Sequence, residues 1–268
     1  METEDFDKLK ASGAKLVFMY TKNCIPYDNI LYLFKLLNVD LKECLLIDKP
    51  CIVDNLIVPQ ECQWGNFERK SYTKEYVNLI NKIKARATFN MPRYEKVYFS
   101  RTKIKDCLNR DHGECAIERV FRKKGYKIIY PETISFKEQL SILSQCQFFA
   151  ATEGSVSHNA IFCKPGTEVA IIRKCDLINQ YQLIVNEVAD LDVHYIDSHK
   201  SINLLDDMKY RGPFFLYLSD NLRKYLGEME WIWHWPYWLL PSWWYQRNFN
   251  RKIVRRMERL FFSLTNKL

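Results

Sequence analysis

The middle of the chain alternates between short apolar runs and longer amphipathic stretches. Five apolar runs have the length of buried strands and occupy residues 96–100, 127–130, 148–151, 169–172 and 193–196. Between them, apolar residues recur at helical spacing over residues 115–124, 135–143 and 177–189. Strands that alternate with helices predict a parallel sheet covered on both faces. We place this Rossmann-like α/β domain at residues 95–205.

The first 94 residues repeat the alternation over a shorter length. The pattern predicts a frayed lead-in over 1–12, strands over 15–20, 45–47 and 52–58, and helices over 29–37 and 73–87. We therefore expect a second Rossmann-like domain over residues 1–94, which is short for a complete nucleotide-binding half. This domain is either shortened or completed by a partner.

Local signals mark several of these boundaries. Ser135 and Glu138 have the spacing of a capping box, which begins the helix over 135–143. Thr73 stands where a cap is expected, and Gly125 follows the helix over 115–124 as a glycine that ends it.

The end of the chain, residues 206–268, differs in composition. Its tryptophans cluster around two prolines, and they are Trp231, Trp233, Trp235, Trp238, Trp243 and Trp244. Beyond them, apolar residues between Ile253 and Leu264 line one helix face, and arginines and a lysine occupy the other. A Trp-rich, cationic and amphipathic helix is typical of a membrane interface. The alternative is that this stripe packs across the N-terminal domain.

The charge is concentrated in the same segment. The chain carries +8, and residues 247–268 hold seven Lys or Arg against Glu258, which is +6 and leaves +2 for the rest. This remainder is too small for a dedicated nucleic-acid binder, so we expect no nucleic-acid partner. No Gly-x-Gly-x-x-Gly follows any predicted strand, which disfavours a Rossmann-type oxidoreductase.

The nine cysteines show no spacing typical of zinc ligands. Their odd number, with no visible secretory signal, indicates a reducing compartment. No apolar run reaches the roughly 18 residues of a spanning helix. We expect a cytoplasmic protein that lies on the inner face of the membrane through its tail.

Candidate binding residues follow from the predicted sheet, because open parallel sheets bind ligands at the carboxyl ends of their strands. The positions that follow the five strands are Arg101, Glu132, the turn 152–155, Arg173 and Asp197. Arg101 is the best phosphate ligand among them, since a guanidinium offers a fork of donors to diphosphate oxygens. The alternative for Arg101 is a surface salt bridge.

The turn after the third strand contains further candidates. Gly154 lets the backbone approach a phosphate, Ser155 can cap the next helix and donate to the phosphate, and Asn159 can bind a ribose or sugar. His158, on the same helix face as Ser155, is either a catalytic or ligand-binding residue or a packed one. The simpler alternative is an ordinary strand–helix turn that contains a glycine.

A sugar transfer also needs a base. Glu153, on the turn beside the donor site, can accept a proton if burial raises its pKa, whereas a helix N-terminus would lower that pKa and make it a poor base. Asp190-Leu191-Asp192 matches the Asp-x-Asp of metal-dependent glycosyltransferases. It precedes a strand and so falls on the opposite edge of the sheet, which predicts that no metal ion is used.

The motif Gly154-Ser155-x-x-His158-Asn159, followed by Phe162-x-x-Pro165-Gly166-Thr167-x-Val169, resembles the signature of glycosyltransferase family 61. Bacterial members of that family build capsular and other surface polysaccharides. Ser100-Arg101, Pro131-Glu132 and Glu138-Gln139 resemble further family positions. The resemblance implies two Rossmann-like domains (a GT-B-like fold), a donor held by the C-terminal one, metal-independent catalysis and inversion at the anomeric carbon.

These inferences lead to one functional hypothesis and one alternative. The protein is expected to move a sugar from a nucleotide-diphosphate donor to a hydroxyl of a lipid-linked or oligosaccharide acceptor in surface-polysaccharide synthesis. Arg101, Glu132, Gly154, Ser155 and Asn159 would bind the donor, and Glu153 and His158 are the catalytic candidates. The alternative is a non-catalytic, membrane-bound subunit that binds a nucleotide sugar. The sequence also leaves a homo-oligomer open.

Overall fold

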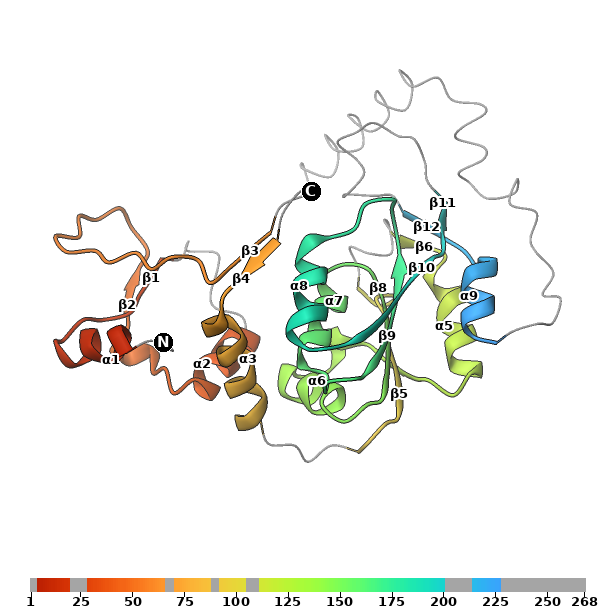
Figure 1. Cartoon of the computed structure of the whole chain (residues 1–268), viewed down its shortest axis with the longest axis horizontal. Helices are drawn as coiled ribbons and strands as arrows, with labels where there is room; N and C mark the ends of the chain where they lie inside the picture. The colour runs from red at the N-terminus through yellow and green to blue at the C-terminus, as the bar shows by residue number, and fades with distance from the viewer. Residues whose placement is uncertain are drawn as a thin grey trace, which may run out of the picture.

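The structure is a computed structural model of the chain, and it describes residues 4–19, 28–65, 70–87, 92–104, 111–200 and 214–227 (Figure 1). The predicted amphipathic helix and the tryptophan cluster before it fall within 228–268 and lie outside these described residues.

A five-stranded parallel sheet forms the centre of the molecule (Figure 1). Its strands, in chain order, are β5 (Lys96–Phe99), β7 (Lys127–Ile129), β8 (Phe148–Thr152), β9 (Glu168–Arg173) and β10 (Asp192–Asp197). They pair in the order β10-β9-β8-β5-β7, and every neighbouring pair is parallel. The parallel sheet and the position of each of its strands confirm the sequence prediction.

Side chains alternate between the two faces of the sheet and form two cores. Val97 and Phe99 belong to the first core, and Tyr98 between them belongs to the second. The first core is covered by α2 (Asp28–Leu36), α3 (Lys74–Arg86), α6 (Phe136–Leu143) and α8 (Gln180–Val188). The second is covered by α5 (Glu114–Lys123) and α9 (Asp220–Tyr225). Each fully buried Val, Leu, Ile or Phe side chain in these cores stabilises the fold by about 1.5–3 kcal/mol.

Strand order determines where a ligand can bind. The chain passes from β5 to its neighbour β7 through α5 on one face, and it then crosses to β8, on the other side of β5, through α6 on the opposite face (Figure 1). The connections therefore diverge between the carboxyl ends of β5 and β8. In open α/β sheets this topological switch point is where ligands bind.

The helix boundaries follow local capping. At α6, Ser135 and Glu138 form the predicted capping box, because each backbone N–H donates to the other residue's side chain, at 2.7 and 3.3 Å. The predicted start of α8 was wrong: the helix begins at Gln180 and not at residue 177. Asn179 is its N-cap, because the Asn179 side chain accepts a hydrogen bond from the backbone N–H of Tyr181.

In the described part of the first 94 residues, the elements form two small sheets and three helices. They are α1 (Glu4–Ala11), β1 (Val17–Met19), α2, a 3-10 turn η1 (Leu41–Glu43), β2 (Leu45–Ile47), β3 (Gln63–Gly65), β4 (Lys70–Tyr72) and α3. β1 pairs with β2 in parallel, and β3 pairs with β4 antiparallel. Among the described residues before 95, these pairs do not join into a larger sheet, so a second Rossmann-like domain stays a prediction.

Two predictions for this region were wrong. The start of the chain contains a helix, α1, where a frayed lead-in was expected. Residues 52–58 form no strand: Ile52 is 94% exposed and Val58 77% exposed. Asp54 and Asn55 interrupt that apolar run, and both favour bends over extended pairing.

A further small sheet was not predicted. It consists of β6 (Asp111–His112), β11 (His199–Lys200) and β12 (Phe214–Leu216) in the order β11-β12-β6. Strands of two or three residues are too short to show a period of two, which explains the omission. This sheet places β6 beside the carboxyl end of the central sheet.

Residues 214–227 lie within the segment assigned to the tail, and they pack against the second core through Leu216 and Leu222. Among the described helices, none is both long enough and apolar enough to cross a bilayer.

Candidate functional site

Arg101 and Gly154 lie together at the switch point. Arg101 follows β5 and Gly154 follows β8. A Cβ atom on Gly154 would lie 3.2 Å from Arg101 Nη1, and the residue's φ of 134° is one that side chains rarely adopt. The backbone conformation therefore favours glycine here, and the guanidinium of Arg101 packs closely against it. The structure thus brings together two of the residues that the sequence predicted for phosphate binding.

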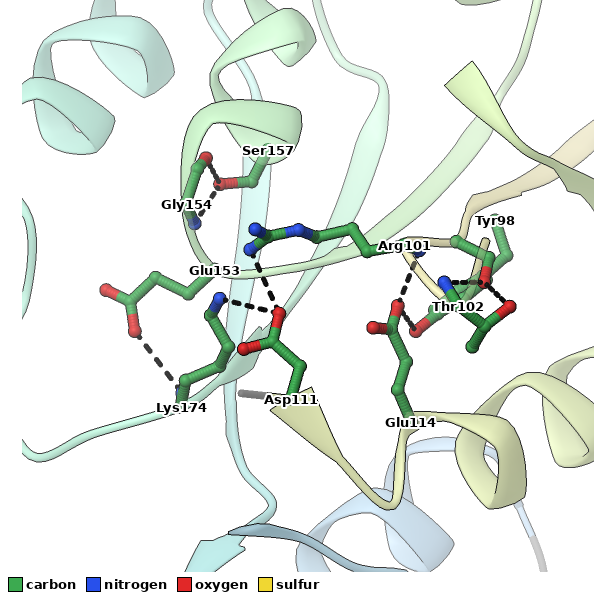
Figure 2. A network of polar contacts seen from close by, with 10 residues as sticks. Tyr98, Arg101, Thr102, Asp111, Glu114, Glu153, Gly154, Ser157 and Lys174 are labelled. Atoms are coloured by element: carbon green, nitrogen blue, oxygen red, sulfur yellow. Dashed lines mark hydrogen bonds and ion pairs between the residues drawn. The ribbon is translucent and has the colours of Figure 1, made fainter. Parts of the chain in front are cut away.

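A buried ion cluster surrounds this turn (Figure 2). Asp111 Oδ2 lies 3.3 Å from Arg101 Nη1 and 3.3 Å from Lys174 Nζ. The three side chains are 12%, 3% and 8% exposed for Arg101, Asp111 and Lys174. Arg101 therefore forms an ion pair, as the alternative reading expected, but a buried one. Buried charges are retained only when they are paired.

Glu114 holds the backbone of Arg101 in place. Its Oε1 accepts from the Arg101 backbone N–H at 3.0 Å and from the Tyr98 hydroxyl at 3.1 Å (Figure 2). Burial raises the pKa of Glu114 to about 7, although both hydrogen bonds act in the opposite direction.

Glu118, one helical turn after Glu114 on α5, organises the other side of this strand end. Its carboxylate accepts from the hydroxyls of Ser100, Thr102 and Tyr130 and pairs with Arg122. Burial raises the pKa of Glu118, but these four contacts outweigh it, and the net pKa is lowered. Glu118 is therefore an ionised carboxylate that holds the residues at the end of β5 in place.

The sequence reading missed these acidic residues and Lys174. Glu114 and Glu118 are spaced four residues apart and so share one helix face, which is the signal that could have found them. Lys174 stands next to Arg173, directly after a predicted strand. No sequence pattern marked Asp111 as a site residue, because it reaches the site through β6, a strand of only two residues.

Glu153 is buried beside the cluster, with 5% of its surface exposed. Burial raises the pKa of this carboxyl group, which is the condition that the sequence argument set for a base. Its Oε2 faces the backbone N–H of Lys174 at 3.5 Å, and the carboxyl group points away from Arg101 (Figure 2). The catalytic role of Glu153 stays a prediction.

The turn after Gly154 differs from the expected helix. α7 (Ser155–His158) is a single turn that continues into the 3-10 turn η3 (Asn159–Phe162). The expected cap at Ser155 was wrong: Ser155 is exposed, and Ser157 Oγ accepts from the Gly154 backbone N–H at 3.2 Å. A helix this short has little macrodipole, so positive charge at the turn comes from side chains.

The remaining predicted residues lie around this turn. His158 is half-buried, its Nε2 has no hydrogen-bond partner among the described residues, and burial lowers its pKa. Asn159 donates to Gln139 at 3.4 Å, and Gln139 in turn donates to the carbonyl of Pro131. That link ties the turn to the segment that holds Glu132, which is exposed after β7.

The other strand-end residues pair with each other. Arg173 Nη1 lies 2.7 Å from Asp197 Oδ1, across the ends of β9 and β10. Asp192 begins β10, so the Asp-x-Asp motif lies at the opposite edge of the sheet, as predicted. Within the described parts of the chain, no group of three His, Cys, Asp or Glu residues is arranged to hold a metal ion. Metal independence stays a prediction.

Comparison with known families gives one result. The model for Glycosyltransferase 61 matches residues 16–170, which include Arg101, Gly154 and the turn that follows. No curated protein matches the chain. Since the matched region is more than half of the chain, the protein belongs to glycosyltransferase family 61.

Proposed function

We propose that this protein is an inverting glycosyltransferase that moves a sugar from a nucleoside-diphosphate donor to a hydroxyl group of a glycan. Its family implies glycosyltransferase activity, with a nucleotide-sugar donor and a glycan acceptor. The observation that carries the proposal is the position of Arg101: a buried guanidinium at the switch point of a parallel sheet, in contact with a glycine turn.

The reaction is a single displacement. A base removes the proton from the acceptor hydroxyl, and the oxygen attacks the anomeric carbon from the face opposite the leaving group. The bond to the diphosphate oxygen breaks, and its electron pair leaves with the nucleoside diphosphate. Arg101 stabilises the charge that develops there, because its donors are already oriented before the reaction.

Glu153 is the proposed base. A general base works best when its pKa lies near the working pH, and burial raises the pKa of Glu153 towards that range. His158 is the second candidate, since burial lowers its pKa and favours the neutral imidazole that can accept a proton.

The donor's other groups are assigned to the residues around the turn. The Gly154 backbone and the exposed Ser155 hydroxyl would contact a phosphate. Asn159 and Glu132 would contact the ribose or the sugar. Gln139 connects their two segments, because it accepts a hydrogen bond from Asn159 and donates one to the carbonyl of Pro131, the residue before Glu132. No metal ion is part of the proposal.

The proposal is tested by thermal unfolding with UDP, GDP, CDP and NAD in EDTA. One nucleoside diphosphate at 100 times its Kd should stabilise the protein by about 2.7 kcal/mol, which corresponds to a rise in Tm of about 5–10 °C. Arg101→Ala should abolish this rise and the transferase activity. Arg86→Ala removes an arginine that donates to the Leu36 carbonyl away from the site, and it should keep both.

An Arg101→Ala protein that folds and still transfers sugar would refute the role of Arg101. If no nucleoside diphosphate stabilises the wild-type protein, the donor site itself is wrong.

The acceptor and location are also proposed. A lipid-linked acceptor at the cytoplasmic membrane face, in capsule or other surface-polysaccharide synthesis, would suit the basic, Trp-rich segment at 231–268. Sedimentation with anionic vesicles, but not with neutral ones, is the expected result. Equal recovery in the supernatant with both would contradict it.

One observation favours the second candidate, a non-catalytic subunit that binds a nucleotide sugar. Ile52, Leu56 and Val58 are 94%, 59% and 77% exposed, which is unusual for a region that stands alone. A purified monomer that turns over a nucleotide sugar would exclude this alternative.

A further inference from the structure

We infer that Lys174 and Arg101 together form a phosphate clamp, and that the Asp111 carboxylate lies where a donor phosphate would bind and competes with it. The inference rests on the proposed function, since the clamp is a part of the proposed donor site. It adds a second phosphate-binding residue, which lies outside the region matched by the family model, and a competing group within the chain itself.

A single oxygen atom shows where the anion belongs. Asp111 Oδ2 is 3.3 Å from the guanidinium of Arg101 and 3.3 Å from the ammonium of Lys174 (Figure 2). A negatively charged oxygen between a fork of donors and an ammonium is the arrangement that proteins use for phosphate oxygens. Since the three side chains are at most 12% exposed, little water screens the two cations.

The glycine turn lies against the same two cations. A Cβ atom on Gly154 would lie 3.2 Å from Arg101 Nη1 and 3.7 Å from Lys174 Nζ. A phosphate held by both cations would therefore also lie beside the turn backbone, which was the sequence's candidate for phosphate contact. Three independent segments, after β5, β8 and β9, converge on one point.

Lys174 is held in place from several directions. Its Nζ lies 4.8 Å from the centre of the Phe214 ring, and its backbone N–H faces Glu153. Burial lowers the pKa of Lys174, and this effect outweighs the nearby Asp111, which raises it, so the net pKa is lowered. An ammonium stripped of water in this way gains more from an arriving anion than an exposed one does.

Asp111 competes with such an anion. With Asp111 in place, each clamp cation already has a counter-charge, and Glu114 and Glu153 are buried close by. A diphosphate therefore gains its full interaction only when the Asp111 carboxylate gives up its contacts. β6, which carries Asp111, is a two-residue strand at the edge of its sheet and pairs with β12 alone among the described strands.

The test is calorimetric titration with inorganic pyrophosphate and with the stabilising nucleoside diphosphate, in EDTA. Lys174→Met should weaken binding of both at least about tenfold, as expected for the loss of a charged hydrogen bond. Asp111→Asn keeps the shape but removes the competing charge, and it should strengthen binding about tenfold. A gain in affinity cannot result from a damaged fold.

Two further variants separate charge from structure. Lys84→Met is the matched control, because Lys84 is also part-buried, its pKa is also lowered by burial, and it donates to the Cys163 carbonyl away from the site. It should bind as the wild type does. Lys174→Arg should keep most of the affinity that Lys174→Met loses.

The outcomes distinguish the inference from the function on which it rests. If Arg101→Ala abolishes binding but Lys174→Met binds like the wild type, the clamp is refuted and the donor site stands. If Asp111→Asn weakens binding as Lys174→Met does, Asp111 is a scaffold and not a competitor, and the inference is again overturned. If the wild-type protein binds neither ligand, both the inference and the proposed function fail.

Discussion

At the scale of single residues, the site depends on how burial changes acids and bases. Glu114 and Glu153 are both buried, and burial raises the pKa of each. They differ in their contacts: Glu114 Oε1 accepts hydrogen bonds from the Arg101 backbone N–H and the Tyr98 hydroxyl, whereas the Glu153 carboxyl group faces the backbone N–H of Lys174. We propose Glu153 for proton transfer because its pKa is raised and it belongs to the turn that carries Gly154.

Glu153→Gln is therefore expected to lower kcat by about 10²–10⁴ and to change the donor KM little. The base must be ionised to act, so wild-type activity should fall as the pH falls through the Glu153 pKa, which burial places above the usual 4.5. Steady-state kinetics across pH measures both effects.

Glu95→Gln is the control, because Glu95 is exposed at the opposite end of β5, and its kinetics should match the wild type. If Glu153→Gln retains full kcat, the base is another group, and His158 is the next to test.

At the scale of elements, the small sheet β11-β12-β6 decides where Asp111 lies. Gly113 separates β6 from α5, with φ at 93°, and a Cβ atom there would lie 2.0 Å from the Leu216 carbonyl oxygen of β12. The close approach of β12 to this turn therefore requires glycine. Gly113 also lets α5 begin directly after β6, so that Asp111 and Glu114 both reach the end of β5.

Gly113→Ala should destabilise the protein by about 2–4 kcal/mol, from left-handed strain and the forced movement of β12. Tm should then fall by roughly 5–15 °C, and nucleotide binding should weaken because Glu114, which holds the backbone of Arg101, shifts. Thermal unfolding with and without the nucleotide measures the two effects.

Gly125→Ala is the matched control. Gly125 has a φ of 82°, but beyond its chain neighbours no atom of the described residues lies within 4 Å of its added Cβ, so this variant carries the backbone strain alone. The packing explanation would be wrong if the two variants lost equal stability.

At the scale of the whole molecule, one sheet supports both the core and the site. Helices from the N-terminal part, α2 and α3, pack on its first face, and α9 from the later part packs on its second. At one edge of the same sheet, the carboxyl ends of β5, β8 and β9 hold an ion cluster whose side chains are at most 12% exposed. The same burial has a measurable effect on global stability.

Stability should fall as the pH rises from about 4.5 to 7 because of Glu114. Its pKa is raised to about 7 in the folded protein, so over this range the folded state keeps a proton that the unfolded state loses. The contribution is roughly 3 kcal/mol, from a pKa of about 7 in the folded protein against the usual 4.5. Glu114→Gln keeps the hydrogen-bond acceptor and removes the titration.

The variant should therefore gain stability relative to the wild type between pH 4.5 and 7, and the difference should level off above that range. Urea unfolding at several pH values measures it, and Glu95→Gln, which changes an exposed carboxylate at the opposite end of β5, is the control. A constant difference between Glu114→Gln and the wild type would contradict the raised pKa.

The sequence predicted much of the central domain and part of the site. Apolar runs located all five strands of the parallel sheet, and the rule that ligands bind at strand ends selected Arg101 and the Gly154 turn. The motif around Gly154 indicated the family that the comparison later confirmed. These signals are local, since each depends on residues within one strand, one turn or one helix.

Other features could not be predicted, and each depends on contacts between distant segments. Residues 52–58 have the composition of a strand but no partner among the described residues, and pairing is a tertiary property. Ser155 looked like a cap, but the single-turn α7 uses Ser157, whose hydroxyl also contacts Gln182 on α8.

The sequence by itself determined the parallel α/β sheet, which residues follow its strands and the family, because strand length, helix period and turn residues act locally. The tertiary structure alone decided which charges meet. Asp111 and Lys174 are 63 residues apart and share one ion pair. Only the strand order and the small sheet beside it bring them to Arg101, because electrostatic contacts depend on distance in space and not on separation along the chain.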